Sequence, residues 1–311
     1  MTASTTSTYP FYQIDVFTDK GFLGNPLAVI VALDTALPIP NDEQMQKIAN
    51  WTNLSETTFL LPPTDPTKAD YKVRIFTPNV ELSFAGHPTI GTCRAFLEYT
   101  RSKKKSVVQE CEAGLVELQV ADSGSIAFTA PPLRKTGPVE EETVKVVCES
   151  MGIAREDVLD TQWIVNGPHW FALLLKDAET VLKASRIPTL ASKQFEFGIV
   201  GQYHKSAAAT TPSGEGKEVG GAPFFEIRAF PHLDLIDEDP VCGSFNAGVA
   251  QWLIGNGVAP ASYVASQGLA LGRRGRIVVH RDDSDLSLEA TKRAVWVGGQ
   301  TVVCIQGTIQ V

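Results

Sequence analysis

Two short segments of the chain combine glycine with polar side chains close to an expected helix. The segment "AGHPTIGT" holds Gly86 and His87, and "DPVCGS" holds Asp239, Gly243 and Ser244. The start of a helix leaves backbone N–H groups available to an anion, and glycine lets a ligand approach the backbone closely. We therefore expect two helix starts that could bind a carboxylate or an enolate.

A glutamate, Glu56, could supply a general base. It lies in "NLSETTFLLP", between an expected helix over residues 41–52 and a short strand, with Leu54 and Phe59 as apolar neighbours. Removal from water raises the pKa of a carboxyl group towards the range that is useful for proton transfer. The alternative is a solvated carboxylate at a helix end. His87 could likewise exchange a proton near neutral pH, or it could be a turn residue bonded to the backbone.

The thiol of Cys242 allows a different chemistry. A thiol beside a helix start can have a lowered pKa and react, and cofactor-free racemisation uses two thiols on opposite faces of the substrate. The two halves of the chain resemble each other and can be aligned in two ways, which are described below. In these alignments the counterpart of Cys242 is Ile90 or Ala85, and neither has a thiol. A two-thiol epimerase is therefore disfavoured. Asp239 could also be a plain turn residue before Pro240, and Ser244 could be a helix N-cap.

The bulk composition narrows the class of protein. The chain has 311 residues, 43% of them hydrophobic, and a net charge of -8, which argues against a nucleic-acid partner. Five cysteines without CxxC spacing predict reduced thiols in the cytoplasm. No apolar run approaches the roughly 18 residues that would span a membrane. The sequence has no metal-binding or nucleotide-binding motif, so no metal and no cofactor are expected.

The chain contains an internal similarity. "RIFTP" (74–78) resembles "RAFPH" (228–232), and expected helices over 89–103 and 246–257 follow. One alignment sets "HPTIGT" (87–92) against "DPVCGS" (239–244), and a second sets "AGH" (85–87) against "CGS" (242–244). Both predict two related halves with the plan strand, glycine-containing turn, helix.

The pair Pro131-Pro132 marks the expected boundary between two lobes. The first lobe would cover 10–130 and the second 131–304, and residues 305–311 could return to complete the sheet of the first lobe. The loop 206–221 would either order over a ligand or stay loose.

Taken together, several segments resemble the PhzF family of phenazine-biosynthesis proteins, which are relatives of diaminopimelate epimerase. They are "IDVFTDKGFLGNPLAVI", "NLSETTFLLP", "RIFTPNVELSFAGHPTIGT", "EDPVCGS" and "SQGLALGRRGRIVV". The resemblance implies an α+β fold of two pseudo-symmetric lobes, each a curved mixed β-sheet wrapped around a central helix. It also implies an active site between the lobes and a homodimer.

The resemblance implies a chemistry as well. The family's characterised reaction is the cofactor-free isomerisation of trans-2,3-dihydro-3-hydroxyanthranilate, so a small carboxylic acid is the expected substrate. Glu56 matches the glutamate that shuttles the proton, and His87, Asp239 and Ser244 match polar residues of the site. Gly86 and Gly243 match the glycines that line it.

The chain departs from the family pattern beside the second helix start. Cys242 replaces the usual threonine, and Phe245 and Asn246 replace small residues, so added bulk could reshape the site for another substrate. Other functions stay open: an epimerase that uses Glu56 and Cys242, a lyase or cyclase that acts on a natural-product intermediate, or a non-catalytic metabolite-binding protein.

Overall fold

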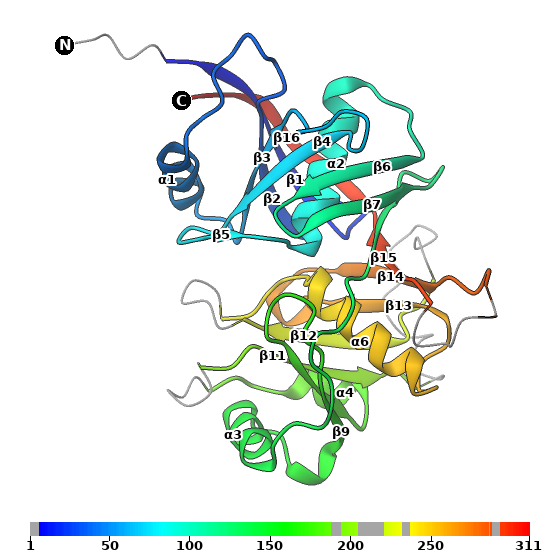
Figure 1. Cartoon of the computed structure of the whole chain (residues 1–311). Coiled ribbons are helices and arrows are strands. Elements are labelled where there is room, and N and C mark those ends of the chain that lie inside the picture. Colours follow the sequence, from blue (N-terminus) through cyan, green and yellow to red (C-terminus); the bar gives the residue numbers. More distant parts are fainter. Residues whose placement is uncertain (1–5, 188–193, 205–220, 232–236, 286, 288–292) are drawn as a thin grey trace. The chain divides into compact units, whose positions relative to one another are not determined.

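The chain divides into two units in the computed structural model, which describes residues 6–187, 194–204, 221–231, 237–285, 287 and 293–311 (Figure 1). The first unit comprises Met1–Phe128 and Gly299–Val311, and the second comprises Thr129–Gly298. In the described part of the chain, no helix has the length and apolar character that a membrane crossing requires.

The first unit is built on a mixed sheet in which the strands run in the order β16-β1-β2-β3-β4-β6-β7-β8. The pairs β2–β3 and β4–β6 are parallel and the others are antiparallel. β5 pairs with β4 beside this path. Strand β16 follows the whole second unit in sequence, yet it pairs with β1, from Thr8↔Gln310 to Val16↔Thr301. The strands are β1 (Thr8–Val16), β2 (Asn25–Val31), β3 (Thr57–Leu61), β4 (Tyr71–Phe76), β5 (Glu81–Leu82), β6 (Ser106–Cys111), β7 (Gly114–Val120), β8 (Ile126–Thr129) and β16 (Thr301–Gln310).

Two helices accompany this sheet. Helix α1 (Asp42–Thr52) begins at Asn41, whose side chain accepts from the Gln44 amide while the Gln44 side chain accepts from the Asn41 amide. This capping box satisfies two donors that a helix start leaves open. Helix α2 (Gly86–Thr100) contacts β1, β2, β3, β4, β6 and β16, and its first turns are buried. It is the central helix of the first unit.

The second unit has a sheet in the order β15-β14-β13-β12-β11-β10-β9. Helix α6 is buried along almost its whole length, because it is apolar on all sides. The strands are β9 (Val158–Trp163), β10 (Phe171–Leu175), β11 (Phe197–Gln202), β12 (Phe225–Phe230), β13 (Ser262–Gln267), β14 (Gly275–Arg281) and β15 (Val295–Gly299). The helices are α3 (Glu141–Met151), α4 (Ala178–Lys183) and α6 (Gly243–Gly255), with 3-10 turns η1 (Arg155–Asp157) and η2 (Leu269–Leu271).

The two units repeat one plan, which confirms the predicted internal similarity. Apart from β5 and β16 in the first unit and α3 and the two 3-10 turns in the second, each runs β-β-α-β-β-α-β-β-β, with α1 and α2 in the first unit and α4 and α6 in the second. The pairing repeats too: the parallel pairs β2–β3 and β4–β6 correspond to β10–β11 and β12–β13. The N-caps of the buried helices are Ala85 and Cys242. The alignment of "AGH" with "CGS" is therefore the structural one, and Ser244, rather than Asp239, is the counterpart of His87.

Both buried helices begin earlier than the sequence pattern predicted. Helix α2 starts at Gly86 instead of residue 89, because Pro88 fits the first turn, where no N–H is needed. Helix α6 starts at Gly243, so the idea that Ser244 is its N-cap was wrong. Helix α4 was missed, although Asp177 caps it by accepting from the Thr180 amide. Of the loop 206–221, all but Gly221 lies outside the described residues.

Candidate functional site

The first candidate site joins two residues from different elements of the first unit. Glu56 lies just before β3, after the left-handed C-cap of α1 at Asn53, and His87 lies in the first turn of α2. The Oε2 atom of Glu56 is 3.3 Å from the Nε2 atom of His87. Both side chains are largely enclosed, with 12% of Glu56 and 4% of His87 exposed. Glu56 is therefore a nearly buried carboxyl group rather than a solvated one.

Asn25 determines where the ring of His87 carries its proton. The amide nitrogen Nδ2 of this buried asparagine, the first residue of β2, lies 3.3 Å from Nδ1 of His87. An amide nitrogen only donates, so Nδ1 accepts and the proton of a neutral ring lies on Nε2. The Nε2–H group then faces Glu56.

Burial keeps the ring of His87 neutral. Loss of solvent lowers the pKa of His87 to about 3. A nearby carboxylate favours the charged ring, but the ring is so enclosed that burial dominates. His87 therefore offers an N–H donor at neutral pH, and the structure does not favour the hypothesis that it exchanges a proton in that range.

Close packing places α2 so that His87 meets both partners. A Cβ atom added at Gly91 would lie 2.5 Å from Cδ2 of Leu27 in β2, so only glycine lets the helix approach this strand. The hydroxyl groups of Thr58 in β3 and Thr92 in α2 lie 2.8 Å apart. These contacts fix α2 against the two strands that lead from Asn25 and Glu56.

In the second unit, Ser244 takes the place that His87 has in the first. Its hydroxyl accepts a hydrogen bond from Nε1 of Trp170 at 3.0 Å. Its backbone carbonyl accepts from Nδ2 of Asn166 at 2.8 Å. The ring of Trp170 packs edge-on against Phe245, with 5.4 Å between the centroids. Ser244 is thus a buried, oriented hydroxyl.

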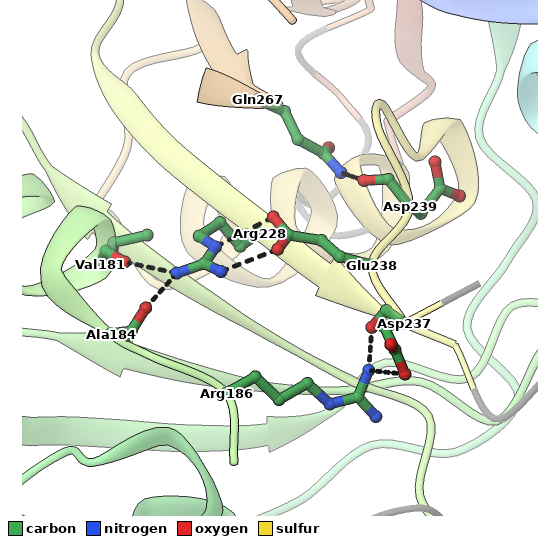
Figure 2. Close-up of polar contacts among 8 residues, drawn as sticks. All are labelled: Val181, Ala184, Arg186, Arg228, Asp237, Glu238, Asp239 and Gln267. Atoms are coloured by element: carbon green, nitrogen blue, oxygen red, sulfur yellow. Dashed lines mark hydrogen bonds and ion pairs between the residues drawn. The ribbon is translucent and has the colours of Figure 1, made fainter. Parts of the chain in front are cut away.

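Asp239 is held before the start of α6 by its own backbone. Its amide donates to the Ala229 carbonyl of β12 at 2.8 Å. Its carbonyl accepts from Nε2 of Gln267 at 2.9 Å (Figure 2). Its carboxylate oxygen Oδ1 accepts from the Val241 amide at 3.0 Å. Burial raises the pKa of Asp239 to about 6. This carboxyl group therefore titrates near neutral pH.

Cys242 does not have the environment of a reactive thiol. It is 5% exposed, and burial, together with the nearby Asp239 carboxylate, raises its pKa well above the ordinary value. Its structural counterpart in the first unit is Ala85, which has no thiol. Two-thiol chemistry requires a thiol with a lowered pKa and a second thiol at the corresponding position. Cys242 and Ala85 meet neither requirement.

The bulky residues after Ser244 are accommodated within the second unit. Phe245 is fully buried, and a Cβ atom added at Gly198 of β11 would lie 2.3 Å from Cζ of its ring. Asn246 donates from Nδ2 to the Cys242 carbonyl at 2.8 Å and to Oε1 of Gln267 at 2.9 Å. The ring of Phe245 therefore packs against the sheet, and the expectation that its bulk reshapes the site has no support in this packing.

Four of these residues were missed by sequence reasoning: Asn25, Trp170, Asn166 and Gln267. Asn25 stands in "GFLGNP", and an asparagine beside glycine gives no sign of a distant histidine partner. Gly86 and Gly243 lie at the first helical position of α2 and α6, because both helices begin three residues earlier than the sequence pattern predicted. Among the residues that the structure describes, no group of three or more His, Cys, Asp or Glu side chains could hold a metal ion.

Comparison with known proteins places these observations in a family. Residues 14–307 match the model of a family described as phenazine biosynthesis-like protein. The chain is 38% identical over 309 residues to antisense-enhancing sequence 1 of Schizosaccharomyces pombe, covering 96% of this chain and 98% of that protein. It is 28% identical over 297 residues to an uncharacterized isomerase of Pasteurella multocida, covering 94% and 91%.

A solved structure has the same fold. It is the crystal structure of a PhzF-family phenazine biosynthesis protein from Enterococcus faecalis, which superposes with a TM-score of 0.75 at 22% identity. The match covers 98% of this chain and all of that one.

Proposed function

Because the chain belongs to the PhzF family of phenazine biosynthesis-like proteins and has their diaminopimelate epimerase-like α+β fold, we propose that it is a cofactor-independent isomerase. It moves a proton within a small unsaturated carboxylic acid. The observation that carries the proposal is the contact of 3.3 Å between the carboxylate of Glu56 and the Nε2 atom of a neutral His87.

Glu56 is the proposed general base and acid. Its ionised carboxylate removes a proton from an activated C–H bond, and the resulting carboxylic acid returns that proton to a conjugated carbon of the same substrate. The electron pair of the broken C–H bond spreads into a dienolate and then forms the new C–H bond, so the reaction needs no oxidant. His87 orients the carboxylate through its N–H group and contributes no charge of its own.

The start of α2 is the proposed binding point for the negative substrate. The N-cap Ala85 makes no side-chain capping bond, so the amides of Gly86 and His87 are not capped by it. Amides at a helix start stabilise a carboxylate and the charge that develops on an enolate. Gly86 adds no side chain that would obstruct the approach.

We propose that the second unit serves the same reaction through three residues. Asp239 is the second acidic group, because burial brings its pKa to about 6 and thus into the range of proton exchange. Ser244 offers a hydroxyl that Trp170 orients. Gly243 starts α6 as Gly86 starts α2.

The test is NMR of trans-2,3-dihydro-3-hydroxyanthranilate in D2O with the wild-type protein. The Glu56→Gln variant should abolish turnover, and Glu112→Gln, which changes an exposed carboxylate between β6 and β7, should leave it unchanged. Loss of turnover only in Glu56→Gln supports both the reaction and the base. Equal turnover in Glu56→Gln and wild type would exclude Glu56 as the base.

Absence of turnover with the wild type would exclude this substrate. The same spectra on a panel of small unsaturated acids and amino acids then separate the remaining functions. Deuterium incorporated at a single carbon that inverts would identify an epimerase, and elimination or ring closure would identify a lyase or cyclase. Binding without any C–H exchange would indicate a metabolite-binding protein.

A further inference from the structure

The segment that leads into α6 is held at three consecutive residues. Asp237 accepts from the Arg186 guanidinium, Glu238 pairs with Arg228, and the Asp239 carbonyl accepts from Gln267 (Figure 2). The Asp239 amide also donates to the Ala229 carbonyl. We propose that the Arg228–Glu238 pair is a positioning device that fixes the carboxyl group of Asp239 for the reaction. This inference rests on the proposed function.

The pair has a geometry that resists movement. Nε of Arg228 donates to one oxygen of Glu238 at 2.9 Å, and Nη2 donates to the other at 2.7 Å. Two parallel bonds fix direction as well as distance. Nη1 donates to the carbonyls of Val181 and Ala184 at the end of α4, so the guanidinium is also tied to a helix. The side chains of Arg228 and Glu238 are each only 7% exposed.

The pair acts on Asp239 through the backbone. Arg228 and Ala229 are neighbours on β12, and successive side chains of a strand point to opposite faces. The Arg228 side chain donates hydrogen bonds to the Glu238 carboxylate, while the Ala229 carbonyl accepts from the Asp239 amide at 2.8 Å. Two adjacent residues of one strand therefore hold two adjacent residues of the incoming segment. Figure 2 shows the Asp239 carboxyl directed away from the ion pair.

The first unit repeats the device, which indicates that it belongs to the helix starts rather than to one loop. Arg74 of β4 binds both oxygens of Glu81, at 2.7 and 2.6 Å. Glu81 and Glu238 stand at the same distance in sequence before the N-caps Ala85 and Cys242. The copy in the first unit is more open, with 22% of the Arg74 and 32% of the Glu81 side chain exposed. The buried copy stands next to the carboxyl group that we assign to the reaction.

The test uses Arg228→Lys and Glu238→Gln. Each substitution removes the paired hydrogen bonds between the guanidinium and the carboxylate with little change in side-chain volume. Turnover of trans-2,3-dihydro-3-hydroxyanthranilate should fall in kcat by roughly ten- to hundredfold, because a catalytic group that shifts by about 1 Å costs that much. In the pH profile of kcat, the limb that reflects the ionisation of Asp239 should move to lower pH. Water that reaches the less firmly held carboxyl group stabilises its charged form and lowers its pKa. The kcat of the double variant should be no lower than that of the less active single variant, because each single substitution already disrupts the same ion pair.

Two control variants separate positioning from loss of stability. Val147→Ala removes a buried side chain from α3, and Arg155→Lys breaks another two-bond pair, with Glu141. Both should keep the wild-type pH profile. A kcat in Arg228→Lys and Glu238→Gln equal to that of the controls would overturn the proposal.

Hydrogen–deuterium exchange tests the device independently of any substrate. The Asp239 and Val241 amides, bonded to Ala229 and to the Asp239 carboxylate, should exchange about tenfold faster in Arg228→Lys and at the wild-type rate in Val147→Ala. If the wild type isomerises none of the acids in the panel, the proposed function fails, while this measurement still decides whether the Arg228–Glu238 pair holds Asp239. Unchanged exchange at these amides would overturn it, and faster exchange confined to them would support it.

Discussion

The carboxylate of Glu56 faces the Nε2 atom of His87 at 3.3 Å, and the ring that it faces is neutral. A charged histidine in this place would neutralise the carboxylate and weaken it as a base. A neutral ring leaves the charge of the carboxylate available for the proposed proton transfer. In the proposed function, the use of the pair for proton transfer thus depends on the burial of His87 and on the tautomer that Asn25 selects.

Replacing Asn25 by alanine should slow turnover by about tenfold. The change removes the donor to Nδ1 of His87, so the proton is no longer confined to Nε2, and a lost buried hydrogen bond of this kind is worth roughly 1 to 1.5 kcal/mol. Steady-state kinetics should show the loss in kcat. The control is Asn50→Ala, which loses only a bond to the Pro78 carbonyl and should match wild type.

The free energy of unfolding should depend on pH through His87. The pKa of His87 is about 3 in the folded protein and 6.5 in the unfolded chain, so only the unfolded chain takes up a proton as the pH falls below 6.5. The free energy of unfolding therefore decreases by about 2 kcal/mol between pH 6.5 and pH 5 on account of this residue. Urea denaturation of the wild type and His87→Gln at both pH values would show it, and equal pH dependence in the two proteins would contradict it.

The variant Asp239→Asn should be more stable and less active. The pKa of Asp239 is raised from 3.8 to about 6, so the folded protein keeps a proton that the unfolded chain releases between these pH values. The free energy of unfolding therefore falls as the pH rises from 3.8 to 6. Above pH 6 the folded protein bears the full cost of a buried, ionised Asp239 carboxylate. The asparagine avoids this cost and should raise the free energy of unfolding at pH 8 by roughly 3 kcal/mol. Thermal denaturation and turnover, measured on the same preparation, check both halves of the prediction.

Removing the thiol of Cys242 should have little effect on the reaction. Burial raises the pKa of this thiol well above its ordinary value, so it stays protonated and should not react with iodoacetamide at pH 8. Mass spectrometry should find the same number of labels on the wild type and on Cys242→Ala, with turnover within a few-fold. A large loss of turnover in Cys242→Ala would revive the epimerase that uses Glu56 and Cys242.

Breaking the buried ion pair from one side should destabilise the protein strongly. Arg228→Met leaves the Glu238 carboxylate buried without its partner, which costs roughly 3 to 5 kcal/mol in the free energy of unfolding. Arg228→Met combined with Glu238→Leu should recover most of that loss, because no buried charge remains. Denaturant unfolding of the single and double variants measures the coupling, and a double variant as unstable as Arg228→Met would refute this account.

Sequence reasoning reached the repeated plan of the fold because local patterns carry it. The strand ending in "RIF" or "RAF", the glycine-containing turn and the apolar helix each depend on residues close in the chain. It could not choose between the two alignments of the halves, because that choice rests on where each helix starts. The expected helix began at residue 89, after Pro88, yet this proline occupies the first turn of α2.

The partners of the candidate residues were beyond sequence reasoning for a different reason. Asn25 reaches His87, and Trp170 reaches Ser244, across long stretches of chain. Such contacts arise from sheet order and from close packing at positions such as Gly91. A polar residue in a turn gives no local sign of which distant helix it will meet.

The pairing of β16 with β1 has a consequence for biosynthesis. The first unit emerges from the ribosome with β1 as an uncovered sheet edge, and its closing strand arrives only after the entire second unit has been made. Folding of the first unit is therefore completed last, by a long-range pairing of the slow kind. Until then the nascent chain carries an open β-edge, on which another copy, or a chaperone, could pair in place of β16.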